Sequence, residues 1–202
     1  FGLSFCKYVI ELSKIQKSKI DKQNLGKVLY DVELPLIKVL AAMEKDGFKV
    51  DKSVLLSYGE KLSKEIDYLT AAIYKAADME FNINSPVQLG EVLFTKLELP
   101  SGKKTKRGYS TSADILEKLK DKHPIVSDVL KYRTLTKLKS TYVDGLSTLI
   151  ASDGRIRPDF QQTVAATGRI SCTEPNLQNI PIRNEYGRLL RKAFMPTDGN
   201  IL

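Results

Sequence analysis

A heptad repeat of apolar residues constrains the fold of this chain more than any other feature of its sequence. The apolar positions recur at intervals of seven, with two isoleucines between them: Leu55, Leu62, Leu69 and Ala76, together with Ile66 and Ile73. The pattern predicts one helix from Asp51, whose side chain is suited to cap the N-terminus, to about Ala77. A helix with such a seam is expected to pack along its length on a second helix.

The expected partner is a long helix over residues 125–150. Its apolar residues are Ile125, Val129, Leu135, Leu138, Tyr142, Leu146 and Leu149. The helix is long enough to return antiparallel along the first one. Between the two, residues 81–123 predict a small helical tip. One short helix begins at Asn84, Ser85 and Pro86 and ends near Phe94, and another covers residues 112–122.

Further helices are expected before this pair, and short strands after it. Residues 1–30 predict one or two helices, and residues 31–48 predict another, which Gly47 is suited to end. Its apolar stripe is Leu36, Val39, Leu40 and Met43. After Ala151, Asp153-Gly154 signals a turn and residues 155–163 and 165–171 predict two antiparallel strands. Residues 184–194 predict a short helix or turn that leads into a final strand. The expected fold class is mainly α with a small β part (α+β).

The positive charge of the chain is concentrated in its second half. The net charge is +8; residues 1–100 hold 14 Lys/Arg and 14 Asp/Glu, whereas residues 101–202 hold 18 and 10. Segregated positive charge is typical of nucleic-acid-binding surfaces, and a basic face that only aids solubility is the alternative. The sequence has no apolar run of 18 or more residues, so no membrane span is predicted. It also has no signal-peptide pattern at its N-terminus. Cys6 and Cys172 have no metal-binding or disulfide spacing, which fits a reducing cytoplasm.

The most basic stretch lies within the predicted tip. Four cations occur within residues 103–107, and hydroxyl groups follow at the start of the next predicted helix. Cations, small hydroxyls and unpaired backbone N–H groups are common phosphate ligands. The candidate phosphate-binding residues here are Lys103, Lys104, Thr105, Lys106, Tyr109, Ser110, Thr111 and Ser112. The alternative is an exposed loop that is basic only for solubility.

Two further groups of residues can present donors to a polyanion. Arg133 and Lys137 are four residues apart and share one face of the second long helix, away from its apolar residues. Residues 163–194 are interrupted by glycine and proline and predict an irregular scaffold. This scaffold carries Arg169, Asn176, Gln178, Asn179, Arg183 and Arg188. A solvated helix face and a polar surface loop are the respective alternatives.

Several of these segments resemble the bacterial family A DNA polymerases, the family of DNA polymerase I. ATGRIS (166–171), EPNLQNIPIR (174–183) and GRLLRKAF (187–194) resemble the start of the palm subdomain. FNINSPVQL (81–89), KKTKRGYSTSA (103–113) and YRTLTKLKSTY (132–142) resemble segments of the thumb. The resemblance implies three parts: the end of a 3′–5′ exonuclease-like domain at 1–30, the thumb at 31–150, and the N-terminal part of the palm at 151–202.

The resemblance also implies roles for the candidate residues. Asn84, Ser85 and the basic tip stretch, with Arg133 and Lys137, would contact the sugar-phosphate backbone of the product duplex. Val87 stands where the family commonly has lysine, which removes one phosphate contact. Arg169, Asn176 and Gln178 would lie at the primer-terminal region, where long donors can test base-pair geometry in the minor groove. Asn179 is a further expected DNA-binding residue of this segment. Arg183 and Arg188 would lie near phosphates.

Catalysis in this family requires divalent cations held by carboxylates. The acidic residues after residue 140 include no strand-end pair, so we expect no catalytic residue and no bound metal in this chain. The parent enzyme would use Mg²⁺ and deoxynucleoside triphosphates, which bind only with the rest of the palm and the fingers. Leu12, four residues after Tyr8, stands where a working exonuclease has a metal-binding aspartate, which indicates that proofreading is absent. His123, the only histidine, is expected to cap a helix.

The chain begins with Phe1 and stops at Leu202 within an apolar strand, so we expect a piece of a longer polymerase, inactive alone. Its expected partner is primer–template duplex DNA, in a monomeric bacterial protein of the cytoplasm and nucleoid with no membrane contact. The alternatives are a stand-alone duplex- or RNA-binding module without catalysis and a helical scaffold whose charges serve only solvation.

Overall fold

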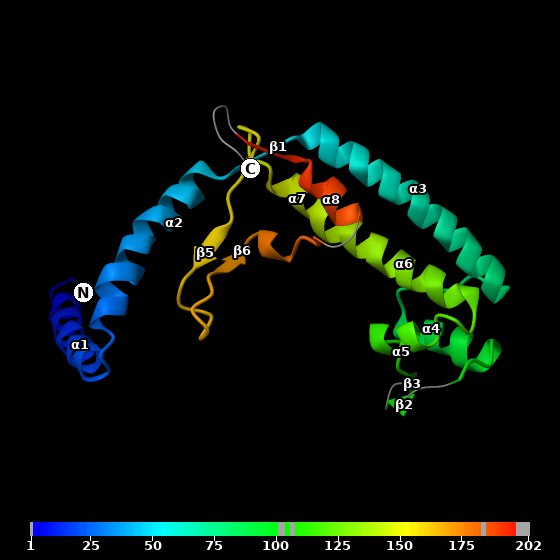
Figure 1. Ribbon diagram of the computed structural model, residues 1–202, viewed down its shortest axis with the longest axis horizontal. Helices are drawn as coiled ribbons and strands as arrows, with labels where there is room; N and C mark the ends of the chain where they lie inside the picture. The colour runs from blue at the N-terminus through cyan, green and yellow to red at the C-terminus, as the bar shows by residue number, and fades with distance from the viewer. Residues whose placement is uncertain (1, 101–103, 106–107, 183–184, 197–202) are drawn as a thin grey trace. The chain divides into compact units, whose positions relative to one another are not determined.

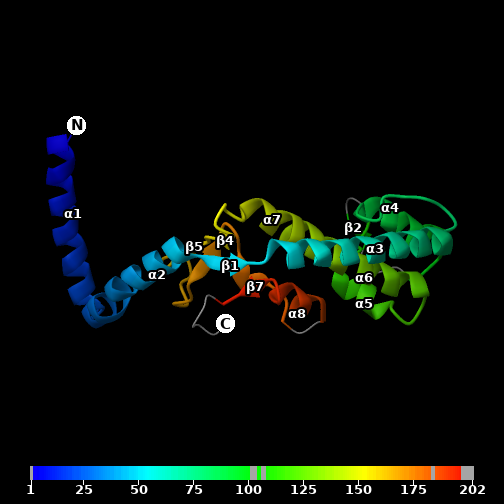
Figure 2. The same cartoon turned by 90° about the horizontal axis from the view of Figure 1, so that it is seen from above.

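The computed structural model describes residues 2–100, 104–105, 108–182 and 185–196 (Figures 1 and 2). Contacts between backbone positions divide the chain into two compact units. The first contains the residues up to Gly47 together with residues 157–178, and the second contains residues 48–156 together with the residues from Asn179 onwards. Helices predominate in both units, and the strands form small antiparallel sheets, which confirms the α+β class.

The second unit is organised by a long helix pair. Helix α3 (Lys52–Ala77) lies beside a continuous helical stretch made of α6 (Pro124–Leu138), η3 (Lys139–Asp144) and α7 (Gly145–Leu149), as both views show (Figures 1 and 2). We call these elements the helix pair. Its buried seam confirms the heptad prediction: Leu55, Leu62, Leu69 and Ile73 of α3 are buried, as are Leu135, Leu138 and Leu146 of the facing stretch.

The seam departs from the heptad at its C-terminal end. Ala77 is fully buried there, whereas Ala76, the predicted position, is half-buried. An α-helix has 3.6 residues per turn, so a strict seven-residue repeat drifts around a straight helix by about 20° per heptad. Over three heptads this drift moves the buried face from Ala76 to Ile73 and Ala77.

The tip, residues 81–123, is a small folded cluster at one end of the helix pair. It contains α4 (Pro86–Glu91), η2 (Val92–Lys96), the paired strands β2 (Lys104–Thr105) and β3 (Gly108–Tyr109), and α5 (Ala113–Lys118). Both predicted helices are present, although the second one ends at Lys118. The tip core joins the helix pair through Ile73, Leu89, Leu93, Leu116 and Ile125.

A three-stranded sheet closes the opposite end of the helix pair. Strand β1 (Phe48–Val50) lies between β4 (Arg155–Ile156) and β7 (Phe194–Met195), antiparallel to both. Helix α8 (Glu185–Arg191) precedes β7. The prediction of one strand over residues 155–163 is wrong, because Pro158 separates β4 from a second short strand. Proline has no N–H to donate to a sheet and interrupts the pairing.

The first unit combines helices with a short hairpin. It contains α1 (Gly2–Lys22), η1 (Val28–Glu33), α2 (Leu34–Asp46), β5 (Asp159–Gln161) and β6 (Ser171–Thr173). Strands β5 and β6 pair antiparallel. The predicted second strand at 165–171 is wrong in its bounds, because β6 begins only at Ser171. Of the apolar stripe predicted on α2, Leu40 is buried, whereas Val39 and Met43 are exposed. Hydrogen bonds from Phe160 N to Glu44 Oε1 (2.8 Å) and from Gln162 Nε2 to Glu33 Oε2 (2.9 Å) hold β5 against the helices.

The backbone before α8 leaves no room for a side chain at Gly187. A Cβ at this position would lie 2.1 Å from the Pro181 carbonyl oxygen. Because backbone atoms cannot move aside locally, Gly187→Ala is expected to lower the free energy of unfolding by about 3 kcal/mol, measured by urea denaturation. Gly26→Ala is the matched control, since its Cβ would meet nothing within 4 Å; equal losses in the two variants would contradict the steric explanation.

The Asp51 cap is expected to make stability depend on pH below about 4. Asp51 Oδ1 accepts hydrogen bonds from Ser53 Oγ (2.6 Å), Ser53 N (2.8 Å) and Val54 N (3.1 Å), and these bonds, the Ser53 hydroxyl first, hold the pKa of Asp51 below its ordinary value. Because the folded-state pKa is depressed, the stabilisation is complete above the unfolded pKa of about 3.9 and is lost as the pH falls through the folded value.

Asp51→Asn keeps the capping geometry but does not titrate. The urea midpoints of this variant and of the unaltered chain should therefore converge as the pH is lowered from 7 to 3. A difference that stays constant over that range would exclude the titration of Asp51 as its cause.

Candidate nucleic-acid interface

The residues predicted to bind DNA occur in both units. The tip and the adjoining part of α6 carry Asn84, Ser85, Tyr109, Ser110, Thr111, Ser112, Arg133 and Lys137. The first unit carries Arg169, Asn176 and Gln178, and the second carries Asn179 and Arg188 near α8. Lys103, Lys106 and Arg183 lie outside the described residues, and for Lys104 and Thr105 the structure describes the backbone of β2.

Turn and cap hydrogen bonds arrange the residues around α4. Ser85 is the N-cap of α4, as predicted, and its hydroxyl accepts from Gln88 N (3.4 Å). Asn82 Oδ1 accepts from Asn84 N (3.0 Å), and Gln88 Oε1 accepts from Asn82 N (2.7 Å). The exposed Asn84 side chain donates from Nδ2 to the Tyr132 hydroxyl (3.3 Å), which ties it to α6. The Asn84 amide is thus held at the surface in one orientation.

The stretch that follows β3 alternates between packed and solvent-accessible side chains. The Tyr109 ring packs on Phe94 with 5.0 Å between ring centroids, and Thr111 is buried. Ser110 is half-buried and Ser112 is exposed. Gly90 allows α4 to approach this stretch, since a Cβ there would lie 3.3 Å from Tyr109 Cβ. The packed residues therefore fix the backbone from which the two serines are presented.

Arg133 orders this stretch from the side of α6. Its guanidinium donates to the Thr111 carbonyl oxygen (2.5 Å) and to Thr111 Oγ1 (3.1 Å), and burial lowers its pKa. Lys137, one helical turn later, is exposed. This differs from the expected arrangement, in which both cations face the duplex. The guanidinium of Arg133 instead satisfies the polar groups of a buried threonine, and Lys137 is the cation that faces solvent.

The first-unit candidates lie on both sides of β6: Arg169 precedes the strand, and Asn176 and Gln178 follow it. Gln178 Nε2 donates to the Ile170 carbonyl oxygen (2.9 Å), and Gln178 N donates to Asn176 Oδ1 (3.1 Å). These bonds hold Gln178 close to the residue that follows Arg169. Arg169, Asn176 and Gln178 are all exposed. The three exposed donors therefore lie on the two segments that flank β6, and the bond from Gln178 to Ile170 holds these segments close together.

The second-unit candidates near α8 are held by tyrosines that the sequence analysis did not single out. Tyr142 donates its hydroxyl to the Asn179 carbonyl oxygen (2.5 Å), and Tyr58 donates to the Tyr186 carbonyl oxygen (2.8 Å). Burial, with the nearby Tyr186 as a smaller cause, raises the pKa of Tyr58 to about 12. A tyrosine within an apolar seam could have indicated this role, because a buried hydroxyl requires a hydrogen-bond partner.

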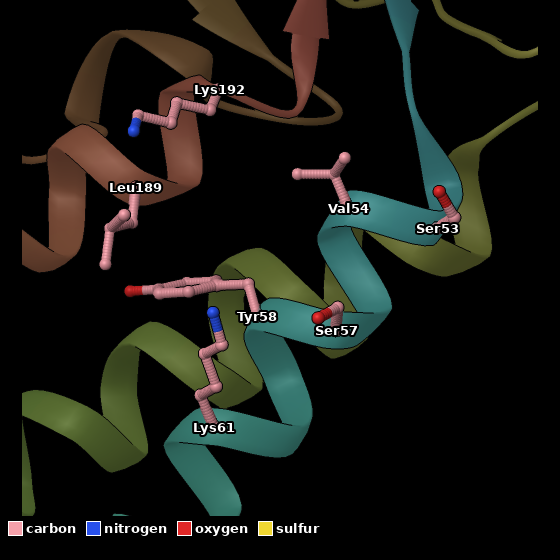
Figure 3. A pocket seen from close by; sticks show the side chains of 7 residues that line it. All are labelled: Ser53, Val54, Ser57, Tyr58, Lys61, Leu189 and Lys192. Carbon is pink, nitrogen blue, oxygen red and sulfur yellow. The ribbon is translucent and has the colours of Figure 1, made fainter.

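A pocket of about 350 Å³ lies between α3 and α8, lined by Ser53, Val54, Ser57, Tyr58, Lys61, Leu189 and Lys192 (Figure 3). The ring of Tyr58 lies across the space between the two helices, while the ammonium groups of Lys61 and Lys192 come from opposite sides (Figure 3). The pocket is open and its lining combines apolar side chains with cations, without a carboxylate.

Within the described ranges, no group of three or more His, Cys, Asp or Glu side chains is placed to hold a metal ion. His123 caps α6 as predicted, with its Nδ1 accepting from Ile125 N (3.2 Å). No described helix is both long and apolar enough to cross a membrane.

Comparison with known proteins identifies one family consistently. The family model described as DNA polymerase family A matches residues 52–202. DNA polymerase I of Lactococcus lactis subsp. cremoris is 50% identical over 175 residues, which cover 87% of this chain and 20% of that protein. DNA polymerase I of Geobacillus stearothermophilus is 51% identical over 181 residues, which cover 89% and 21%. This chain therefore spans about a fifth of the length of these relatives.

Among solved structures, the chain is similar to the POL domain of Pol1 from M. smegmatis in complex with DNA primer-template and dNTP. The TM-score is 0.87 at 44% sequence identity, over 95% of this chain and 34% of that chain.

The contact between Arg133 and Thr111 predicts that the two cations of α6 differ in their effect on stability. Arg133→Ala would leave the buried Thr111 groups without their donor and is expected to lower the free energy of unfolding by about 1–3 kcal/mol. Lys137→Ala should change it by less than about 0.5 kcal/mol. Urea denaturation measures both values, and hydrogen exchange of the amides of residues 109–116 should accelerate only in Arg133→Ala. Equal behaviour of the two variants would show that the Arg133 contact does not stabilise the tip.

Proposed function

This chain belongs to DNA polymerase family A, and we propose that it is the part of such an enzyme that holds primer–template DNA during template-directed synthesis in replication and repair. The observation that carries the proposal is its similarity, over 95% of its length, to a polymerase domain solved with primer-template and dNTP. The catalytic carboxylates and the Mg²⁺ that they bind would be supplied from outside this chain.

The tip is proposed to bind the sugar-phosphate backbone of the duplex. Asn84, Ser110 and Ser112 reach the surface from a backbone fixed by packing and hydrogen bonds, and Lys137 adds an exposed cation beside them. Lys103, Lys104, Thr105 and Lys106 add the basic stretch that precedes these serines. Contacts of this kind position a duplex without reading its sequence, which suits a protein that must bind any template.

The groups near the primer terminus are proposed to test base-pair geometry. Arg169, Asn176 and Gln178 are exposed donors on the segments that flank β6. Asn179 is a further exposed candidate, and Arg188, exposed on α8, is proposed to lie near phosphates. Every Watson–Crick pair presents minor-groove acceptors at nearly equivalent positions. Donors at fixed positions can therefore accept all four correct pairs and lose contacts to misshapen ones.

The domain assignment remains part of this proposal. We assign residues 31–150 to the thumb, residues 151–202 to the N-terminal part of the palm, and residues 1–30 to the end of an exonuclease-like domain. The helix pair with its tip supports the first assignment, and the change to short strands after Ala151 supports the second. We further propose a monomeric bacterial protein of the cytoplasm, associated with the nucleoid.

Binding of this chain to a primer–template duplex, a blunt duplex and a single strand, measured over a salt series, tests the proposal. The logarithm of the association constant should fall linearly with the logarithm of salt concentration, with a slope of about −0.9 for each phosphate contact. Lys137→Ala should reduce the magnitude of this slope by about one contact and weaken binding to all duplex sequences alike. Arg169→Ala should weaken binding to the primer–template more than to the blunt duplex, by about tenfold or more.

Lys64→Ala provides the matched control. Lys64 is an exposed lysine on α3 for which no DNA contact is proposed, so its removal should change the affinity only through net charge. If Lys64→Ala and Lys137→Ala have the same effect, or if the chain does not bind duplex DNA at low salt, the proposed interface is wrong.

A further inference from the structure

Two tyrosine hydroxyls of the helix pair bind the backbone of the segment that begins at Asn179. The Tyr142 hydroxyl on η3 donates to the Asn179 carbonyl oxygen (2.5 Å), and the Tyr58 hydroxyl on α3 donates to the Tyr186 carbonyl oxygen (2.8 Å). Both tyrosines are buried, with 5% of their surface exposed. Both bonds are partly buried, and a carbonyl group there that loses its donor loses part of its hydrogen bonding at a cost in free energy. The two bonds therefore fix this backbone at two points.

The side chain of Tyr186 adds a third attachment, this time to both long helices. Its hydroxyl donates to Glu65 Oε1 on α3 (3.0 Å), and the same oxygen forms an ion pair with Lys131 Nζ on α6 (2.5 Å). Tyr186 thus reaches a carboxylate that is itself held by the facing helix. Figure 3 shows how closely α3 and α8 approach around Tyr58.

Packing also holds the described residues next to these attachments. Ile180 and Leu190 are buried, and Gly187 lies against the backbone of Pro181, where a Cβ would be 2.1 Å from the carbonyl oxygen. Asn179 and Arg188, in contrast, are exposed. The segment therefore presents two candidate DNA-binding side chains from a backbone whose position is set by groups that face the protein interior.

We propose that Tyr58, Tyr142 and Tyr186 are positioning residues for DNA binding. Through the carbonyl groups of Asn179 and Tyr186 and through the Tyr186 side chain, they set the places of Asn179 and Arg188 relative to the helix pair. Affinity for the primer–template then depends on three hydroxyls that do not touch DNA. This inference rests on the function proposed above and extends it to residues without charge.

The test replaces each tyrosine of this chain by phenylalanine and measures primer–template binding over the same salt series. Each variant loses one hydroxyl and keeps its ring and its charge. Tyr142→Phe, Tyr58→Phe and Tyr186→Phe are each expected to bind about threefold to thirtyfold more weakly. The slope against salt should stay unchanged, because no cation has been lost. Tyr68→Phe is the matched control: Tyr68 lies on α3 with 73% of its surface exposed, and the variant should bind as the unaltered chain does.

A double-mutant cycle separates positioning from a general loss of stability. If Tyr186 acts through Arg188, then Tyr186→Phe should weaken binding much less in the Arg188→Ala background than in the unaltered chain. Additive effects, or phenylalanine variants that bind as tightly as the unaltered chain, would overturn the inference.

Glu65→Ala removes the acceptor of the Tyr186 hydroxyl and leaves all three tyrosines in place. It therefore tests the same attachment if a phenylalanine variant does not fold. Its control is Glu60→Ala, which removes an equal charge from an exposed position on α3. Glu65→Ala should bind DNA more weakly than Glu60→Ala. Equal affinities would contradict the inference. If Lys137→Ala weakens binding but none of these variants does, the positioning inference is wrong and the proposed function stands. If the unaltered chain does not bind duplex DNA, both the inference and the proposed function are wrong.

Discussion

The lengthwise packing of α3 on α6, η3 and α7 is the interaction on which the second unit depends. Leu55, Leu62, Ile73, Leu135 and Leu146 are almost completely buried in this seam, and each such side chain contributes about 1.5–3 kcal/mol. Both ends of the seam continue into other structure. At one end Ile73 and Ala77 enter the tip core, and at the other β1 and β4, which flank the pair in the sequence, join the same sheet. One hydrophobic interface therefore supports the tip at one end of the pair and the side of the pair to which α8 is attached through Tyr58 and Tyr186.

The polar residues around the helix pair have two kinds of role. Some are exposed and can contact a ligand, and others form internal hydrogen bonds that hold the exposed residues in place. Arg133 is a cation in a basic segment, yet its guanidinium is used on Thr111. Tyr58 and Tyr142 likewise use their hydroxyls on main-chain carbonyl groups. Lys137 and Arg188 remain exposed. Residue type alone does not separate the two groups, because arginine and tyrosine serve equally well as internal donors. Burial and hydrogen-bond partners do separate them.

The sequence predicted the parts of this fold that depend on local pattern. The heptad located the seam, and the caps at Asp51, Ser85 and His123 formed as expected, since each depends on residues within one helical turn. The sheet of β1, β4 and β7 could not be predicted in this way. Its strands have two or three residues, too few for a periodic signal, and their pairing is decided by the ends of the helix pair. The Tyr58–Tyr186 bond joins residues 128 positions apart; the sequence indicates that a buried hydroxyl needs a partner but not which carbonyl supplies it.

The division between contacting and positioning groups has a consequence for the proposed binding of duplex DNA. Phosphate contacts supply affinity that falls steeply with salt, because each one releases condensed counterions. The bonds of Tyr58 and Tyr142 join uncharged groups and are partly buried, and salt screens such bonds little. Their contribution to the placement of Asn179 and Arg188 therefore persists at salt concentrations that weaken the phosphate contacts. Discrimination by geometry requires donors whose positions are fixed to a fraction of an ångström before DNA arrives, since a displaced donor would accept distorted and correct base pairs alike. Neutral, partly buried hydrogen bonds meet this requirement better than further surface cations, which would add affinity without fixing any donor.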